Sequence, residues 1–469
     1  MAPELVPLPA FRPLCQKARC YPRIIDADEE FLKQEPTFFG LAAGIVKTTT
    51  HSIARRQFLA TSSAALGLGF GSWNTSFATH PSKTKPEPKS VAAIVTIYRK
   101  NSHADVLVGK ILEGWKQDGG TGPALKLSSL YVDQFPADDM SVALAAKHGF
   151  RLCKSIREAI ELDSGTVAVE GVLSIGEHGD YPRNEKGQQL YPRRRFFDEI
   201  ASTFEKFGKV VPVFNDKHPG PVWEDDKWMA DRAHQLNIPW MAGSSLPVSY
   251  RDPDIDFPKG ENLEACVGIG YSGLDIYGFH TLEFLQCLIE KRASPTTGVE
   301  WVQAYTVSSI PELLEQKKID RDLLEAGLAS SGTSLKSVLA STEKESESGV
   351  FLIQYQDGLL APVIMVPGIA TGISAACRLG NSKSFVTRAE ERPEPSYPHF
   401  AYLLKAIEQM IHTGKPTYPV ERSILTSGIL DRALTSKHLG NQRIETPELN
   451  IHYIPSKFSF APHIDLDRY

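Results

Sequence analysis

The sequence has no large excess of charge of one sign. It contains 51 basic and 56 acidic residues among 469, which gives a net charge of -5 at pH 7. A protein that binds nucleic acid or an anionic membrane carries a clustered positive surplus. The balance of charge therefore argues against both partners and favours a small-molecule ligand. With 42% hydrophobic residues, the chain can bury the cores of two or three domains.

Paired cysteines are also missing. Six cysteines occur in the chain, and no two of them form a CxxC pair. Neither a zinc ribbon nor a disulfide framework is therefore predicted. Cys15 and Cys20 lie in the N-terminal leader. The others are predicted to be small buried apolar side chains, namely Cys153, Cys266, Cys287 and Cys377.

A long apolar run is missing as well. The weakly apolar stretch near the N-terminus is too short and too rich in glycine to span a bilayer. It follows the pair Arg55 and Arg56, and the small residues that end at Ala78 offer a cleavage site. This pattern resembles a twin-arginine signal, so we expect residues 1–78 to be a leader read by the twin-arginine translocase and the mature protein to be periplasmic. Residues 1–45 either precede the true start codon or belong to an atypical leader.

Strand and helix patterns alternate after a linker at residues 79–90. "VAAIVTIY" at 91–98 is an unbroken apolar run typical of a buried parallel strand, and "SHADVLVGKILEGW" follows at helical period with Ser102 as its N-cap. Similar units repeat as far as "VVPVFN" and "IPWMAGSS". The alternation predicts that residues 91–245 form an open, mostly parallel α/β sheet with right-handed crossovers.

Polar side chains gather where three of these strands end. Asp133 ends the second strand, and "IGEHGDYP" places Glu177, His178 and Asp180 after the third. "VPVFNDKHPG" ends a later strand with Asp216, Lys217 and His218. Because ligands of such sheets bind beyond the carboxyl ends of the strands, we expect a ligand cleft there. For any one of these residues, an exposed charged loop is the alternative interpretation.

Two motifs resemble the glucose-fructose oxidoreductase, inositol dehydrogenase and rhizopine catabolism protein (Gfo/Idh/MocA) family. "NDKHPG" is similar to the family's acid-Lys-Pro motif, with Lys217 in the lysine position. "GFHTLEFLQCLIEKR" matches a Gly-x-His-x-x-Asp pattern with Gly278, His280 and Glu283. The segment that begins "YPHFAYLLKAIEQ" is similar to the family's closing helices.

This resemblance covers residues 90–450 and implies a fold with two sheets. An N-terminal Rossmann domain is followed in the family by a C-terminal α/β domain built on a large, mostly antiparallel sheet. We expect that second domain at residues 246–455, with a tail at 456–469. The expected fold class is therefore α/β, with a Rossmann-like parallel sheet and a second antiparallel one.

The resemblance also implies hydride transfer between a sugar or sugar derivative and bound NAD or NADP. Lys217 would hold the substrate oxygen, His280 would act as acid and base, and Asp275 would be a further catalytic acid. Asp133 would accept from a ribose hydroxyl, which favours NAD. The other residues expected at the cofactor are Ser102, His103 and Asp216, and those expected at the substrate are His178, Asp180, His218 and Glu283. The structural alternative is that Lys217 pairs with Asp216 in a loop and that His280 packs its helix.

The chain departs from the family in two places. Family members carry G-x-G-x-x-G directly after the first strand, because glycine lets backbone amides approach the pyrophosphate. This chain has "IYRKNSHADV" there, without a glycine. The family's aspartate four residues before the histidine is replaced by Ile276, with Asp275 one residue further back. These departures leave the cofactor open.

Two other functions are compatible with the same side chains. Imidazole and carboxylate ligands suit a divalent metal, which would make the chain a lyase, epimerase or hydrolase without hydride transfer. The ligands for such a metal would come from Glu177, His178, Asp180, Asp216, His218, His280 and Glu283. A non-catalytic sugar-binding relative would use "YPRNEKGQQLYPRRRFF" as a lid or subunit contact. Because family members assemble through arms and through the open face of the second sheet, a homo-oligomer is expected.

Overall fold

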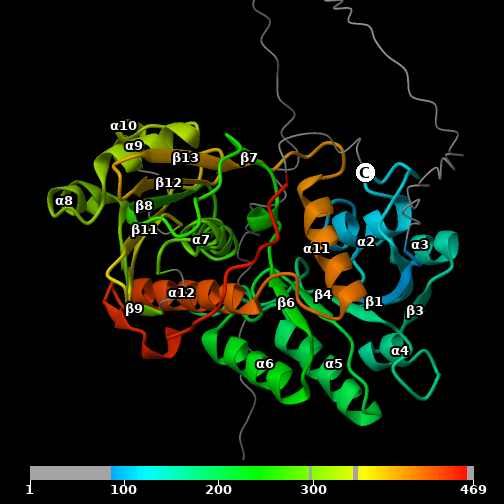
Figure 1. Ribbon diagram of the computed structural model, residues 1–469. Helices are drawn as coiled ribbons and strands as arrows, with labels where there is room; N and C mark the ends of the chain where they lie inside the picture. Colours follow the sequence, from blue (N-terminus) through cyan, green and yellow to red (C-terminus); the bar gives the residue numbers. More distant parts are fainter. Residues whose placement is uncertain (1–85, 295–297, 342–346, 462–469) are drawn as a thin grey trace, which may run out of the picture. The chain divides into compact units, whose positions relative to one another are not determined.

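The computed structural model describes residues 86–294, 298–341 and 347–461, and its two sheets are drawn in Figure 1. The predicted leader at 1–78, most of the predicted linker at 79–90 and the end of the predicted tail lie outside the described residues. One sheet is parallel and the other is mostly antiparallel, and both are covered by helices. The α/β fold class predicted from the sequence is therefore confirmed.

The first sheet has six parallel strands in the order β3-β2-β1-β4-β5-β6. Its strands are β1 (Lys89–Val95), β2 (Leu125–Val132), β3 (Arg151–Cys153), β4 (Gly171–Ile175), β5 (Val213–Asp216) and β6 (Trp240–Gly243). β1 lies in the middle and is buried from Val91 to Val95, as a strand covered on both faces requires. It ends earlier than the predicted position 98. The order of strands reverses between β1 and β4, so a crevice for a ligand is expected beyond their carboxyl ends.

Helices from two distant parts of the chain cover the faces of this sheet. α2 (His103–Glu113) and α11 (His399–Thr413) pack side by side on one face (Figure 1). The other face carries α4 (Ile156–Glu161), α5 (Arg193–Phe207) and α6 (Trp223–Leu236), while α3 (Ser141–His148) packs near β3. The predicted N-cap of α2 is confirmed, because Ser102 Oγ accepts the Asp105 N–H at 3.3 Å.

The second sheet has eight strands in the order β14-β9-β10-β11-β8-β12-β13-β7. Its strands are β7 (Arg251–Asp252), β8 (Leu263–Gly270), β9 (Val299–Tyr305), β10 (Gly349–Tyr355), β11 (Leu360–Met365), β12 (Ser374–Leu379), β13 (Ser384–Ala389) and β14 (Ile444–Glu445). Only the pair β8 and β11 is parallel among the strand pairs of this sheet in the described residues. Alternate residues of each strand face opposite cores, as Val363 and Ile364 of β11 do.

Both faces of the second sheet are also covered. α7 (Ile276–Ile289) and α12 (Val420–His438) pack on the face that shares a core with α5 and α6. α8 (Ile310–Glu315), α9 (Arg321–Ser330) and α10 (Leu335–Ala340) pack on the outer face. Short 3-10 turns occur as η1 (Leu246–Val248), η2 (Val307–Ser309) and η3 (Pro447–Leu449). The outer face, which the resemblance implied to be open for subunit contacts, thus carries helices of its own chain.

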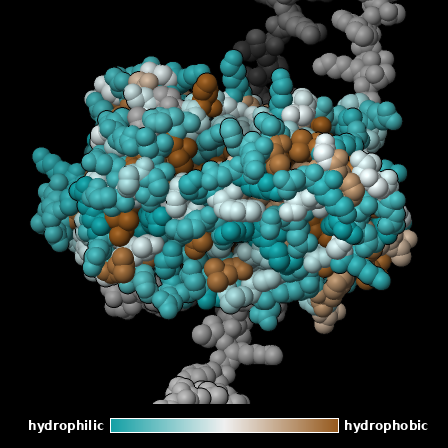
Figure 2. All heavy atoms as spheres, turned by 90° about the horizontal axis from the view of Figure 1, so that it is seen from below, coloured by the Kyte–Doolittle hydropathy of each residue, from teal (hydrophilic) through white to brown (hydrophobic). Residues whose placement is uncertain are grey.

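The four described cysteines are free and buried, as predicted. Among the described residues, no helix is both long and apolar enough to cross a membrane. Figure 2 shows a largely hydrophilic face on which hydrophobic side chains lie in small, separate groups. Scattered exposed apolar residues of this kind are ordinary on soluble domains and do not by themselves mark an interface.

Candidate active site

A buried group of charges lies at the carboxyl ends of β4 and β5. Lys217 follows β5 with a left-handed φ of 62°, and its Nζ lies 2.9 Å from Oε1 of Glu177, which follows β4. The other oxygen of Glu177 accepts from Arg193, at the start of α5, at 2.7 Å. Lys217, Glu177 and Arg193 are 4%, 2% and 0% exposed. We call these three residues the strand-end cluster.

The two cations of the strand-end cluster fix the charge of its acid. Burial alone would raise the pKa of Glu177, but the charges of Lys217 and Arg193 outweigh burial and hold that pKa well below its usual value. Glu177 is therefore ionised, and it positions the ammonium of Lys217. The structural alternative foreseen for Lys217, an ion pair with its neighbour Asp216, is not what the structure has.

Asp216 instead pairs with His103, so two residues predicted to contact the cofactor contact each other. Asp216 Oδ2 lies 2.6 Å from His103 Nδ1, at the first residue of α2. Asp216 is fully buried, and its Oδ1 has no hydrogen-bond partner within the described part of the chain. The His103 ring also packs against His178, with 5.4 Å between ring centroids, and against Phe400 at 4.8 Å. Burial lowers the pKa of His178 to about 3.

His280, on α7, faces the same region with a free nitrogen. Its Nδ1 is buried and has no hydrogen-bond partner among residues 86–294, 298–341 and 347–461. Burial first, and then the charge of Lys217, lowers the pKa of His280 well below its usual value. Burial and the neighbouring cation therefore favour the neutral form of this ring. His218, by contrast, has partners for its ring nitrogens in Arg193 and the Gly220 carbonyl oxygen.

Asp275 stands just before α7 and reaches this region despite its displacement by one residue. Its Oδ2 accepts the Gln189 N–H at 2.8 Å, and Oδ1 lacks a partner among the described residues. Burial raises the pKa of Asp275 to about 6. Glu283 accepts from Ser244 N at 2.7 Å and Ser423 Oγ at 3.0 Å. Glu283 therefore ties the end of β6 to α7 and α12.

Sequence reasoning missed other residues of this site. Arg193 belongs to the stretch interpreted as a lid or subunit contact, and it is buried in the strand-end cluster. Glu391, between β13 and α11, is near enough to Lys217 for the two charges to interact. Burial raises the pKa of Glu391 to about 7, although a hydrogen bond from Tyr271 and the charge of Lys217 lower it. Tyr271 in turn stacks edge-on with Tyr277 at 4.9 Å. No local motif in "AEERPEP" marks Glu391.

The crevice expected for a dinucleotide is spanned by the chain itself. Gln134, after β2, exchanges two hydrogen bonds with the backbone of Asp180, after β4, each of 2.9 Å. Asp133, predicted to accept from a ribose, accepts instead from Arg195 at 2.6 Å, Tyr181 at 2.7 Å and Tyr131 at 2.8 Å. The residues present at this crevice therefore do not fit a dinucleotide.

A metal site is not formed by these side chains either. In the described residues, no three His, Cys, Asp or Glu side chains come together in a way that could hold a metal ion. Asp180 is exposed, and its backbone rather than its carboxylate makes the contacts with Gln134. The metal alternative therefore has no support in the geometry.

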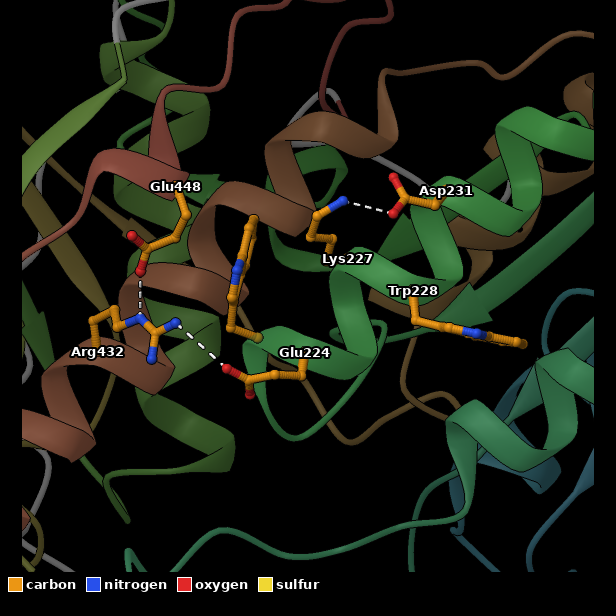
Figure 3. A pocket seen from close by; sticks show the side chains of 7 residues that line it. Glu224, Lys227, Trp228, Asp231, Arg432 and Glu448 are labelled. Atoms are coloured by element: carbon orange, nitrogen blue, oxygen red, sulfur yellow. Dashed lines mark hydrogen bonds and ion pairs between the residues drawn. The ribbon is translucent and has the colours of Figure 1, made fainter.

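A surface pocket of about 480 Å³ lies away from this site, between α6, α12 and η3 (Figure 3). Its charged side chains pair with one another, since Arg432 meets Glu448 at 2.6 Å and Lys227 meets Asp231 at 2.6 Å. None of the side chains predicted for catalysis, cofactor or substrate lines it. We therefore place the candidate active site at the strand-end cluster.

Comparison with known proteins gives the fold. No family model matches the chain, and no curated protein matches its sequence. GenD2 from gentamicin A biosynthesis, solved in complex with NAD, aligns with a TM-score of 0.51 and 12% identity over 77% of this chain and 97% of GenD2.

Two further solved structures align at lower scores. A putative myo-inositol dehydrogenase from Sinorhizobium meliloti 1021 gives a TM-score of 0.48 and 13% identity over 76% of this chain and 99% of its own. Scyllo-inositol dehydrogenase from Lactobacillus casei, with bound NAD(H) and scyllo-inositol, gives 0.48 and 12% over the same shares. At these identities the chain shares with GenD2 its two-sheet, Rossmann-like fold.

Proposed function

We propose that this protein is an enzyme of the sugar-oxidoreductase type that moves a proton at a hydroxyl- or carbonyl-bearing carbon of a sugar or sugar derivative. One observation carries the proposal. The buried ammonium of Lys217 is held by Glu177 at the strand ends and is near enough to His280 for its charge to lower the pKa of that ring, whose Nδ1 has no hydrogen-bond partner among the described residues. Buried polar atoms without partners are rare in folded proteins, and an unpaired imidazole beside a fixed cation suits a bound oxygen ligand.

The chemistry of the two side chains follows from this arrangement. An ammonium has three donors, and Glu177 takes one, so Lys217 has further donors for a substrate oxygen. Its charge would stabilise negative charge that develops on that oxygen. The neutral His280 would take the proton at Nδ1 and return it later. Asp275 and Glu391, whose pKa values are raised to about 6 and about 7, are the acids that stand around the pair.

Two versions of this function differ in whether hydride moves. Oxidation of an alcohol carbon requires a hydride acceptor, and the fold shared with GenD2, solved with NAD, supports NAD or NADP in that role. An epimerase that acts at a carbon next to a carbonyl or carboxylate requires only proton transfer, and a lyase that acts there also expels the β-substituent as its leaving group. The hydrogen bonds between Gln134 and Asp180 across the crevice favour this second version.

Location and assembly belong to the proposal as well. The pair Arg55 and Arg56 ahead of a glycine-rich apolar stretch supports export by the twin-arginine translocase to the periplasm. A homo-oligomer remains a proposal that rests on the family resemblance. Non-catalytic sugar binding is the remaining alternative, and only turnover separates it from an enzyme.

The test compares three forms of the full chain, namely wild type, Lys217→Met and His280→Asn. Polyols, aldoses and sugar acids are supplied in D2O, and NMR follows both product formation and exchange of carbon-bound hydrogen. We expect each variant to lose roughly 100-fold or more in rate, as removal of a charge-stabilising or acid-base group does. Lys227→Met, on the exposed face of α6, is the matched control and should retain full activity.

Two results would contradict the proposal. Full activity of Lys217→Met with a verified substrate would remove Lys217 from the mechanism. Saturable binding of a sugar by the wild type, without product or exchange, would show a binding protein instead. Circular dichroism of each variant checks that the fold is intact.

A further inference from the structure

We infer that the chain closes its own dinucleotide crevice, so that the protein works on its substrate without a nicotinamide dinucleotide lying across β1. The closing element is the segment Glu177–Tyr181 together with Gln134, which we call the bridge. The inference goes beyond the proposed function, because it decides between the version with hydride transfer and the version without it.

The position of the bridge follows from the order of the strands. β1 lies between β2 and β4, and the order of the sheet reverses there, at the point where dinucleotides bind in open α/β sheets. Gln134 stands at the end of β2 and Asp180 follows β4. The Gln134 amide donates to the Asp180 carbonyl and accepts the Asp180 N–H, each at 2.9 Å. A link from the β2 end to the β4 end must pass over the end of β1.

The space under the bridge is filled by side chains. A Cβ on Gly179 would lie 3.3 Å from Ile97 Cγ2 and 2.7 Å from the Tyr181 ring, so the bridge packs directly on the turn that follows β1. Ile97 is 3% exposed and Tyr98 is fully buried. The Thr96 hydroxyl donates to the Glu177 carbonyl oxygen at 2.5 Å, which ties the same turn to the start of the bridge. A glycine-rich turn would leave this volume free for a pyrophosphate.

Backbone amides at the turn that would hold a pyrophosphate already have partners. The first turn of α2 contains the buried carboxylate of Asp105, whose Oδ2 accepts the Asn101 N–H at 2.9 Å. Its backbone N–H donates to Ser102. A helix N-terminus attracts anions through its free amides, but here the chain itself takes up the Asn101 and Asp105 amides, and the Asp105 carboxylate also pairs with Lys100 at 3.3 Å.

The ribose acceptor is also engaged. Tyr181 and Arg195 both donate to the Asp133 carboxylate, so its oxygens hold the bridge and α5 in place. The pKa of Asp133, which burial alone would raise, is lowered by the hydrogen bonds from Arg195 and Tyr181. The turn after β1, the N-terminus of α2 and the expected ribose acceptor Asp133 thus lead to the same conclusion, because residues of this chain contact each of them where a dinucleotide would bind.

The test measures dinucleotide binding by the full-length wild type. NADH and NADPH are titrated by fluorescence, and mass spectrometry examines what the purified protein releases on denaturation, with GenD2 as positive control. We expect no released nucleotide and no saturation up to about 1 mM, the upper end of ordinary enzyme affinities. Release of a stoichiometric nucleotide, or saturable binding below that concentration, would overturn the inference.

A second measurement separates this inference from the proposed function. Turnover or hydrogen exchange of the wild type is followed with and without added NAD and NADP. Activity that depends on Lys217 and is unchanged by either nucleotide supports both ideas. Activity that requires an added nucleotide would contradict the inference that the crevice is closed, but it would agree with the proposed function. If no activity is found at all, the proposed function fails, and the binding titration alone decides the inference.

Discussion

Replacing Glu177 with glutamine should destabilise the fold more than an ordinary loss of one ion pair. Glu177 holds two cations, Lys217 at 2.9 Å and Arg193 at 2.7 Å, and all three side chains are at most 5% exposed. Glutamine keeps the shape but removes the charge, which leaves two buried cations facing each other. Breaking a buried pair costs about 3–5 kcal/mol, so Glu177→Gln should lose about that much free energy of unfolding. Urea unfolding followed by tryptophan fluorescence measures the loss.

The same variant has a predictable pH dependence. The pKa of Glu177 is lowered on folding, so its contribution to stability is fully present above the unfolded value of 4.5 and is lost as the pH falls further. The gap between wild type and Glu177→Gln should therefore stay constant from about pH 8 to about pH 5 and should narrow below that range.

An exposed ion pair provides the control for Glu177→Gln. Asp231→Asn breaks the ion pair with Lys227, in which the Lys227 side chain is 58% and the Asp231 side chain 67% exposed. This change should lower the free energy of unfolding by less than about 1 kcal/mol. In the background of Glu177→Gln, the change Lys217→Met removes one stranded cation and should recover part of the loss. A loss for Glu177→Gln no larger than that of Asp231→Asn would refute the account of the strand-end cluster.

Two further predictions concern stability. Burial raises the pKa of Asp275 from 3.8 to about 6, so its contribution to stability is present below pH 3.8 and is lost as the pH rises through 6. The free energy of unfolding of Asp275→Asn should therefore rise relative to wild type by up to about 3 kcal/mol between about pH 4 and about pH 8. Urea titrations that give the same difference between the two proteins at every pH would contradict this prediction. Gly243 has a φ of 136°, and a Cβ would lie 2.4 Å from Glu283 Oε1, so Gly243→Ala should cost about 3 kcal/mol. Gly414 has a φ of 69° and open space around it, so Gly414→Ala should lower the free energy of unfolding by only about 1 kcal/mol. Equal losses for Gly243→Ala and Gly414→Ala would show that the positive φ, and not the contact with Glu283, sets the loss.

The sheets could be predicted because their signals are local. "VAAIV" reads as a doubly covered strand, and it is β1, buried on both faces. The segments "VEWVQAYTV", "GVFLIQYQDG" and "LAPVIMVPG" carry the β-branched and aromatic residues typical of strands, and they contain β9, β10 and β11. The cover of α8, α9 and α10 on the outer face was not foreseen, since a short amphipathic helix does not reveal which face of which sheet it covers.

The position of Lys217 could be predicted, but its partner could not. A strand end can be located from the pattern, whereas the approach of Glu177 depends on how β4 and β5 pair. Asp216 and Lys217 are neighbours in sequence, yet successive side chains at a strand end point in different directions, and the left-handed φ of Lys217 turns it further. The stretch that contains Arg193, Arg194 and Arg195 was interpreted as a lid or subunit contact, but helical periodicity buries Arg193 and leaves Arg194 and Arg195 exposed.

The strand-end cluster and the bridge share one residue, and this connects the two proposals. Through its backbone Glu177 begins the bridge and accepts from Thr96 after β1, and through its side chain it holds Lys217 and Arg193. A dinucleotide lying across β1 would have to displace the bridge, so we expect its entry to disturb the residue that holds Lys217 and Arg193. In the structure the bridge is in place and Glu177 fixes the ammonium of Lys217.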